Sequence, residues 1–278
     1  MVSNLVLENL TEEVDKLYKT PTQEWVDDTI TEHDKKILKT EAEQESPFDK
    51  LNLKRNLNNS LNQGNAHTIV KRNGGARVVI LRENKNQNEE YPWEIWARIF
   101  QWFGNPKDGG IWQIYLYSSD VKRVLPSDGP IGAEHLNGGY TYPCRGDCIV
   151  IYRYEEATRV LVHELLHASC TDDQNKAVEQ KEAATEAWAE LFLVALMSKG
   201  SAKKVHQLWK VQDHYIQDLN YTVRNFHHVN TPEDYGSRYT ILREDVFKQF
   251  GVKLDPNYKP KRVTISRFTT PELDKYLV

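Results

Sequence analysis

The chain has 278 residues, of which 39% are hydrophobic, and its net charge is −4 at pH 7. This length can enclose a sizeable core, the slightly acidic balance argues against a nucleic-acid partner, and no apolar run approaches membrane-spanning length. Residues 1–8 lack the basic and apolar regions of a secretory signal, and three cysteines form no evident disulfide framework. We therefore expect a protein of the cytoplasm, or one packaged in a particle.

Residues 1–65 are predicted to form a polar helical and extended arm with a linker, ahead of a catalytic domain of residues 66–278. Helices are expected near Glu8–Tyr18 and within Thr22–Glu43, and the Asn-rich segment Asn52–Asn65 is typical of a linker. The first helix carries an apolar stripe, formed by Leu7, Leu10, Val14 and Leu17. We interpret the arm as a docking segment for a protein partner, with an inhibitory propeptide or a solvated extension as alternatives.

A mixed sheet is predicted to begin near His67. Two segments rich in β-branched residues flank Asn73-Gly74-Gly75, which is typical of a hairpin turn. Pro92–Phe103 is predicted to be a buried helix, because apolar side chains cover most of its surface. Three further strands are expected at Ile111–Tyr117, Gly138–Tyr142 and Cys148–Arg153.

The motif His163-Glu164-Leu165-Leu166-His167 follows this sheet, in a segment with helical spacing of apolar residues. Positions i and i+4 share one helix face, so the two imidazoles can bind one metal ion, and Glu164 can reach a water on that ion. A second predicted helix, at about Lys176–Ser198, places Glu182, Glu186 and Glu190 on one side, and its segment Thr185–Glu190 offers a carboxylate as third ligand. Three protein ligands with one open position are typical of catalytic Zn²⁺.

Together these two segments resemble the gluzincins, the thermolysin-like zinc metallopeptidases. The stretch Thr185-Glu186-Ala187-Trp188-Ala189-Glu190-Leu191-Phe192 is similar to the glutamate-helix pattern of that family, and differs from it at Thr185 and Glu190. The resemblance covers residues 149–198. It implies that Glu186 is the third Zn²⁺ ligand and that Glu190 orients His163 through the other ring nitrogen.

The resemblance also implies a fold and a mechanism. The fold is α+β, with a zincin-like catalytic domain in which a mixed twisted sheet and the metal helix precede a mainly helical lobe. Glu164 is implied to be the general base that hydrolyses a peptide or protein substrate. An edge strand at Gly138-Gly139-Tyr140 is the candidate for binding substrate backbone, with a plain hairpin as the alternative. The candidates for the oxyanion donor are Tyr239 first, then His227, His228 and Tyr235.

Other interpretations stay open. Cys144 and Cys148 could join His163 and His167 in a two-Cys, two-His zinc finger, although the gap between the pairs exceeds the usual length of about twelve residues. Cys144 could instead cap the active-site Zn²⁺ as a latency thiolate, or form a disulfide with Cys148. The chain could also be a catalytically silent zincin-fold scaffold of a larger assembly, because a fold can persist without activity.

Overall fold

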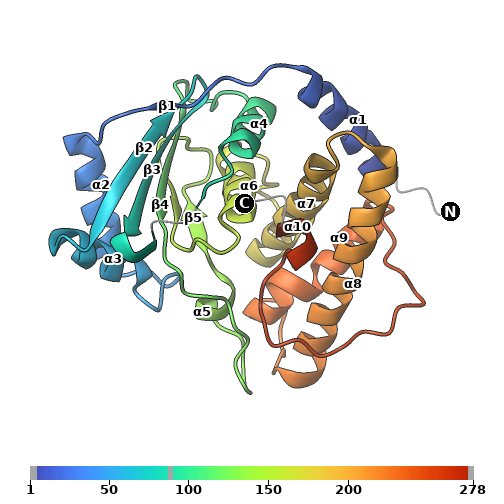
Figure 1. The fold of residues 1–278 in the computed structure, drawn as a ribbon. Coiled ribbons are helices and arrows are strands. Elements are labelled where there is room, and N and C mark those ends of the chain that lie inside the picture. The colour runs from blue at the N-terminus through green and yellow to red at the C-terminus, as the bar shows by residue number, and fades with distance from the viewer. Residues whose placement is uncertain (1–4, 87–89, 275–278) are drawn as a thin grey trace. The chain divides into compact units, whose positions relative to one another are not determined.

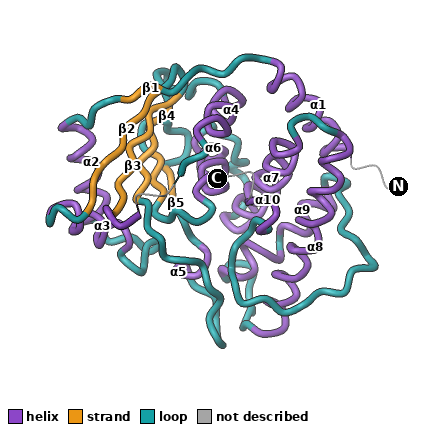
Figure 2. The backbone as a smooth tube through the Cα atoms, in the orientation of Figure 1, coloured by secondary structure: helices purple, strands orange, loops and turns teal. Residues whose placement is uncertain are grey.

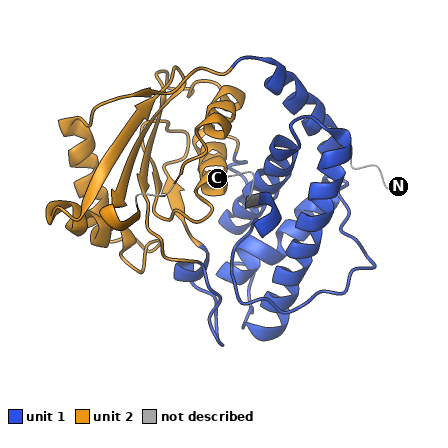
Figure 3. Cartoon of the chain, in the orientation of Figure 1, with its two compact units in different colours: residues 1–21, 123–136, 172–278 blue, residues 22–122, 137–171 orange. Residues whose placement is uncertain are grey.

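The computed structural model describes residues 5–86 and 90–274, which divide into two compact units (Figure 3). One unit, here called the sheet unit, comprises residues 22–122 and 137–171. The other, here called the helical unit, comprises residues 1–21, 123–136 and 172–278. The fold is therefore a mixed α+β fold, as predicted.

The sheet unit contains one mixed sheet of six strands, in the order β1-β2-β3-β4-β6-β5. Its central pairs, β3 with β4 and β4 with β6, are parallel, and the other pairs are antiparallel. Asn73 closes the β2–β3 hairpin, because its side-chain oxygen accepts hydrogen bonds from the Gly75 and Ala76 amides at 2.9 and 2.8 Å. The strands are β1 (Val26–Asp27), β2 (Ala66–Arg72), β3 (Ala76–Glu83), β4 (Trp112–Tyr117), β5 (Gly139–Thr141) and β6 (Ile149–Ile151).

Helices cover both faces of this sheet (Figures 1 and 2). On one face lie α2 (Glu32–Glu43) and α3 (Leu53–Asn62), and on the other lie α4 (Trp93–Phe103) and α6 (Ala157–Ala168). A short 3₁₀ turn, η1 (Asn84–Asn86), follows β3. The predicted strands, the buried helix after Pro92 and the helix of the His-Glu motif are all confirmed.

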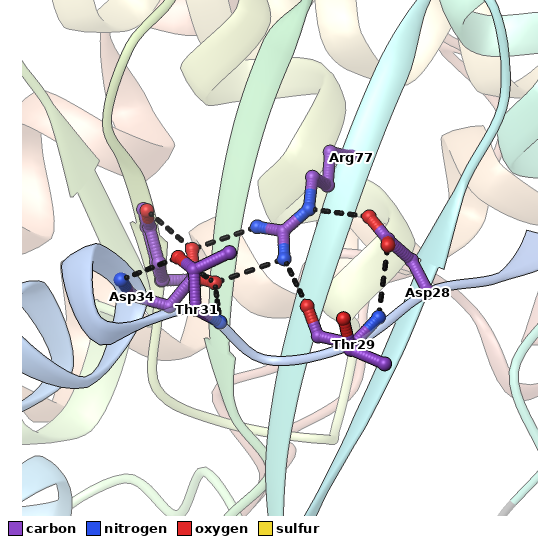
Figure 4. Close-up of polar contacts among 6 residues, drawn as sticks. Asp28, Thr29, Thr31, Asp34 and Arg77 are labelled. Atoms are coloured by element: carbon purple, nitrogen blue, oxygen red, sulfur yellow. Dashed lines mark hydrogen bonds and ion pairs between the residues drawn. The ribbon is translucent and has the colours of Figure 1, made fainter.

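The predicted boundary at residue 65 is wrong for residues 22–65. Leu38, Leu53 and Leu57 of α2 and α3 belong to the same buried apolar cluster as Val79 and Val150 of the sheet. Asp34 at the start of α2 accepts two hydrogen bonds from the Arg77 guanidinium of β3, at 2.7 and 2.8 Å (Figure 4). This segment is part of the core, because the apolar residues of its two helices pack against the sheet.

The helical unit is built mainly from two long helices, α7 (Val178–Ser198) and α8 (Ala202–Phe226). Helix α1 (Leu5–Lys19) lies against both of them and buries Leu7, Val14 and Leu17. The expectation that this stripe faces a protein partner is therefore wrong, since α7 and α8 already cover it. The remaining elements are α5 (Ala133–Leu136), the π-helical turn η2 (Ser237–Ile241), α9 (Arg243–Gln249) and α10 (Pro271–Asp274).

Within the described ranges, no helix is both long enough and apolar enough to cross a membrane.

Candidate metal centre

Helix α6 carries the His-Glu motif, and nearly all of its residues are buried. The imidazoles of His163 and His167 are 7% and 9% exposed, and their Nε2 atoms approach to 3.1 Å. Two nitrogens that each lie about 2.0–2.1 Å from one tetrahedral Zn²⁺ are about 3.3 Å apart. The structure thus brings the two predicted ligand histidines together, at the separation that a shared ion needs.

Both ends of α6 are fixed within the sheet unit. Near its first turn, the indole N–H of Trp96 on α4 donates to the Thr158 hydroxyl at 2.9 Å, and both groups are buried. At its last turn, the His167 carbonyl accepts hydrogen bonds from the Cys144 and Cys170 amides at 3.1 and 3.2 Å. A Cys144–Cys170 disulfide closes the same junction. The histidines therefore lie on a rigid element rather than on a loop.

The predicted substrate-binding segment includes β5, which forms the last strand in the sheet order, next to β6. A Cβ atom on Gly139 would lie 2.6 Å from Val160 Cγ1 and 3.3 Å from Glu164 Oε1. Glycine is required here because β5 approaches α6 so closely. The same approach places the predicted general base beside the edge strand of the sheet. Substrate binding by Gly138, Gly139 and Tyr140 stays a prediction.

Tyr140 follows Gly139 on β5, so the two residues face opposite sides of the sheet. The Tyr140 side chain belongs to a cluster with buried residues of α2 and α3. Its hydroxyl donates to Glu41 at 2.5 Å and accepts from the Lys54 ammonium at 2.5 Å. Burial and the Glu41 carboxylate raise the pKa of the Tyr140 phenol, and burial lowers the pKa of Lys54. Tyr140 is thus held on the sheet face opposite α6, and only its backbone is available to a substrate beside Glu164.

The predicted carboxylate ligands lie on α7 in the helical unit. Glu186 and Glu190 are 2% and 3% exposed. Glu190 accepts hydrogen bonds from Arg243 at 2.5 Å and from Gln212 at 3.2 Å. This buried ion pair explains the burial of Glu190 without a metal. Sequence patterns could not reveal it, because Arg243 is 53 residues away along the chain.

The cysteine alternatives are wrong. Cys144 forms its disulfide with Cys170, so it is neither paired with Cys148 nor available as a capping thiolate. Cys148 is a free, buried thiol in the apolar cluster of α2, α3 and the sheet, and burial raises its pKa to about 12. A finger with both cysteines and both histidines would require Cys144 to be a free thiolate.

The oxyanion-donor candidates also lie in the helical unit. Tyr239 is 8% exposed in η2, where it belongs to an apolar cluster and stacks on Tyr235 at 5.6 Å. His227 is buried and its Nδ1 lies 3.2 Å from the Gly129 carbonyl oxygen, whereas His228 is exposed. The choice among these four residues stays a prediction.

Comparison with protein-family models, with curated proteins and with solved structures finds no match to this chain. The geometry of α6 and β5, together with the motifs on α6 and α7, therefore provides the basis for assigning a function.

Proposed function

We propose that the protein is a Zn²⁺-dependent peptidase. The observation that carries the proposal is the 3.1 Å distance between the Nε2 atoms of His163 and His167 on helix α6. Glu164, the residue after His163, lies beside the edge strand β5. Imidazole nitrogens are preferred Zn²⁺ ligands. Two of them at this spacing fit one ion, and we assign Glu164 to proton transfer rather than to metal binding.

We infer that α7 supplies the third ligand. Glu186 is the first candidate, from the resemblance of its helix to the glutamate helix of gluzincins. Glu182, one helical turn earlier, is the competing candidate as a metal-binding carboxylate. The side chain of Glu190 is already paired with Arg243, and we assign it to holding α7 in place near these carboxylates.

The chemistry follows from the proposed roles. Bound Zn²⁺ would polarise the scissile carbonyl and acidify a water molecule. The Glu164 carboxylate accepts the proton of that water and transfers it to the leaving amine. The backbone of β5 binds an extended peptide by strand addition, which tolerates many side chains. Tyr239 remains our first candidate for stabilising the oxyanion.

The test separates metal binding from hydrolysis. Full-length protein, Glu164→Gln and His167→Ala are compared for zinc content by elemental analysis and for cleavage of a peptide library, with and without chelator. We expect Glu164→Gln to keep its zinc and to lose cleavage by orders of magnitude, whereas His167→Ala loses both. Glu186→Ala and Glu182→Ala form a matched pair, and the variant that loses zinc identifies the third ligand.

Two outcomes contradict the proposal. Equal zinc content in the parent protein and His167→Ala would show that the histidine pair is not the metal site. Zinc that depends on both histidines, with no cleavage of any peptide by the parent protein, would favour a metal-stabilised scaffold over a peptidase.

A further inference from the structure

We propose that the helical unit holds a second binding site, for a small organic anion with an apolar body. The site is a hollow of about 1160 Å³ between α8, α9 and residues 252–260. Small-molecule sites commonly have volumes of about 300–1,000 Å³, so the hollow is large enough to hold a small-molecule ligand. None of the proposed metal ligands lines this hollow.

The floor of the hollow is apolar. Trp209 and Val252 line it and are 5% and 1% exposed, and Leu254 and Pro256 continue the apolar surface. Tyr221, 37% exposed, forms one wall from the next turns of α8. Aromatic and aliphatic surface of this kind favours an apolar ligand body, because burying it from water is favourable.

The hollow is preformed, because the loop after α9 is fixed to α8. Asp213 accepts the Asp255 amide at 2.8 Å, and Gln217 donates to the Asp255 carbonyl at 3.0 Å. Tyr258 stacks on His214 with ring centroids 3.9 Å apart. A ligand would therefore bind without ordering this loop first, which lowers the cost of binding.

The charges at the rim favour an anion. Glu244 is neutralised by Arg224 at 2.8 Å and bonded by Asn220 at 2.7 Å, so this carboxylate is already satisfied. Lys210 and Lys253 also line the hollow and are exposed. Asp213 and Asp255 also line the hollow, but they accept hydrogen bonds from Gln217 and from the Asn257 amide, and Lys210 helps to lower the pKa of Asp255. Among the described residues, neither lysine ammonium is held in a hydrogen bond or a close ion pair. Two such cations above an apolar floor match a carboxylate, sulfonate or phosphate with an alkyl or aryl body.

The test uses 1-anilinonaphthalene-8-sulfonate, an aryl sulfonate whose fluorescence rises on binding, with the full-length protein. We expect Lys210→Glu combined with Lys253→Glu to weaken binding of the probe at least ten-fold. Leu254→Trp, which fills the hollow without changing its charge, should have a similar effect. Decanoate and indole-3-acetate compete with the probe in separate titrations, and the stronger competitor distinguishes an alkyl from an aryl body.

A double variant with the same change in net charge, Lys36→Glu with Lys176→Glu, is the control because both lysines are exposed outside the hollow. Binding that weakens equally in this control would overturn the proposal, since it would reflect overall charge alone. So would unchanged affinity in the Lys210/Lys253 and Leu254 variants when circular dichroism shows that they are folded. Probe affinity should not change in Glu164→Gln, which separates this site from the proposed metal centre.

Discussion

Asp34 offers the sharpest test of how the N-terminal segment is held on the sheet. Its carboxylate is 1% exposed and accepts hydrogen bonds from Arg77 at 2.7 and 2.8 Å and from the Thr31 hydroxyl at 2.7 Å (Figure 4). Burial alone would raise the pKa of this carboxyl. The bonds from Arg77 and Thr31 outweigh burial and lower the pKa from 3.8 to about 2.

This depressed pKa contributes to stability over a defined pH range. A shift of this size corresponds to about 2 kcal/mol, at about 1.4 kcal/mol per pKa unit. Because the folded pKa lies below the unfolded one, the contribution is complete above about pH 4 and is lost as the pH falls towards 2. We expect Asp34→Asn to lower the free energy of unfolding near neutral pH. The difference from the parent protein should shrink by about 2 kcal/mol between pH 6 and pH 2.

Urea unfolding followed by circular dichroism across this pH range measures the difference directly. Glu32→Gln is the matched control, because the Glu32 side chain is on the same helix and 89% exposed, and it should change little at any pH. A difference between Asp34→Asn and the parent that stays constant from pH 6 to pH 2 would refute the reasoning.

Three further changes test other parts of the structure. Arg243→Met leaves Glu190 buried without its cation, and should lower the unfolding free energy by about 3–5 kcal/mol in urea titrations. Cys144→Ser opens a loop of 26 residues and should cost about 3 kcal/mol, measured as a lower melting temperature that no longer responds to reductant. Gly139→Ala would force Val160 away from β5, and should reduce zinc content while the protein stays folded by circular dichroism.

Each change has a control in the same chain. Arg224→Met breaks a more exposed ion pair, in which 45% of the arginine side chain is accessible, and should cost much less than Arg243→Met. Cys148→Ser should not abolish the response to reductant, because Cys148 is outside the disulfide. Gly75→Ala meets no atom closer than 3.6 Å and should leave zinc content unchanged. Equal effects in a change and its control would contradict the corresponding assignment.

The elements with strong local patterns could be predicted from the sequence. Helix α4 is apolar over most of its surface, α7 contains neither glycine nor proline, and Asn73-Gly74-Gly75 has the chemistry of a tight turn. The two histidines of α6 meet as helix periodicity requires. In each case the deciding interactions lie within a few residues of one another.

The features that were missed depend on distant partners. Asn-rich α3 has weak helix propensity, yet Asp49 accepts the Leu53 and Lys54 amides at 2.9 and 3.0 Å, and Leu57 is buried in the sheet's cluster. In the sequence, Asp49 four residues before the apolar Leu53 could have indicated that a helix starts here. The Cys144–Cys170 disulfide joins residues 26 apart, and spacing alone could not select it over a Cys144–Cys148 pair.

Metal removal tests the proposed ligand set as a whole. If His163 and His167 bind Zn²⁺ as proposed, the folded helix α6 holds their Nε2 atoms together for the ion, which the unfolded chain does not. An ion that binds only the folded chain stabilises it by mass action, by about 4 kcal/mol at a free concentration 1,000 times Kd. Chelation should therefore lower the melting temperature in calorimetry. His167→Ala should already have the lower melting temperature and should not respond to chelator. An equal response of the parent protein and His167→Ala would place any metal-dependent stability at some other site.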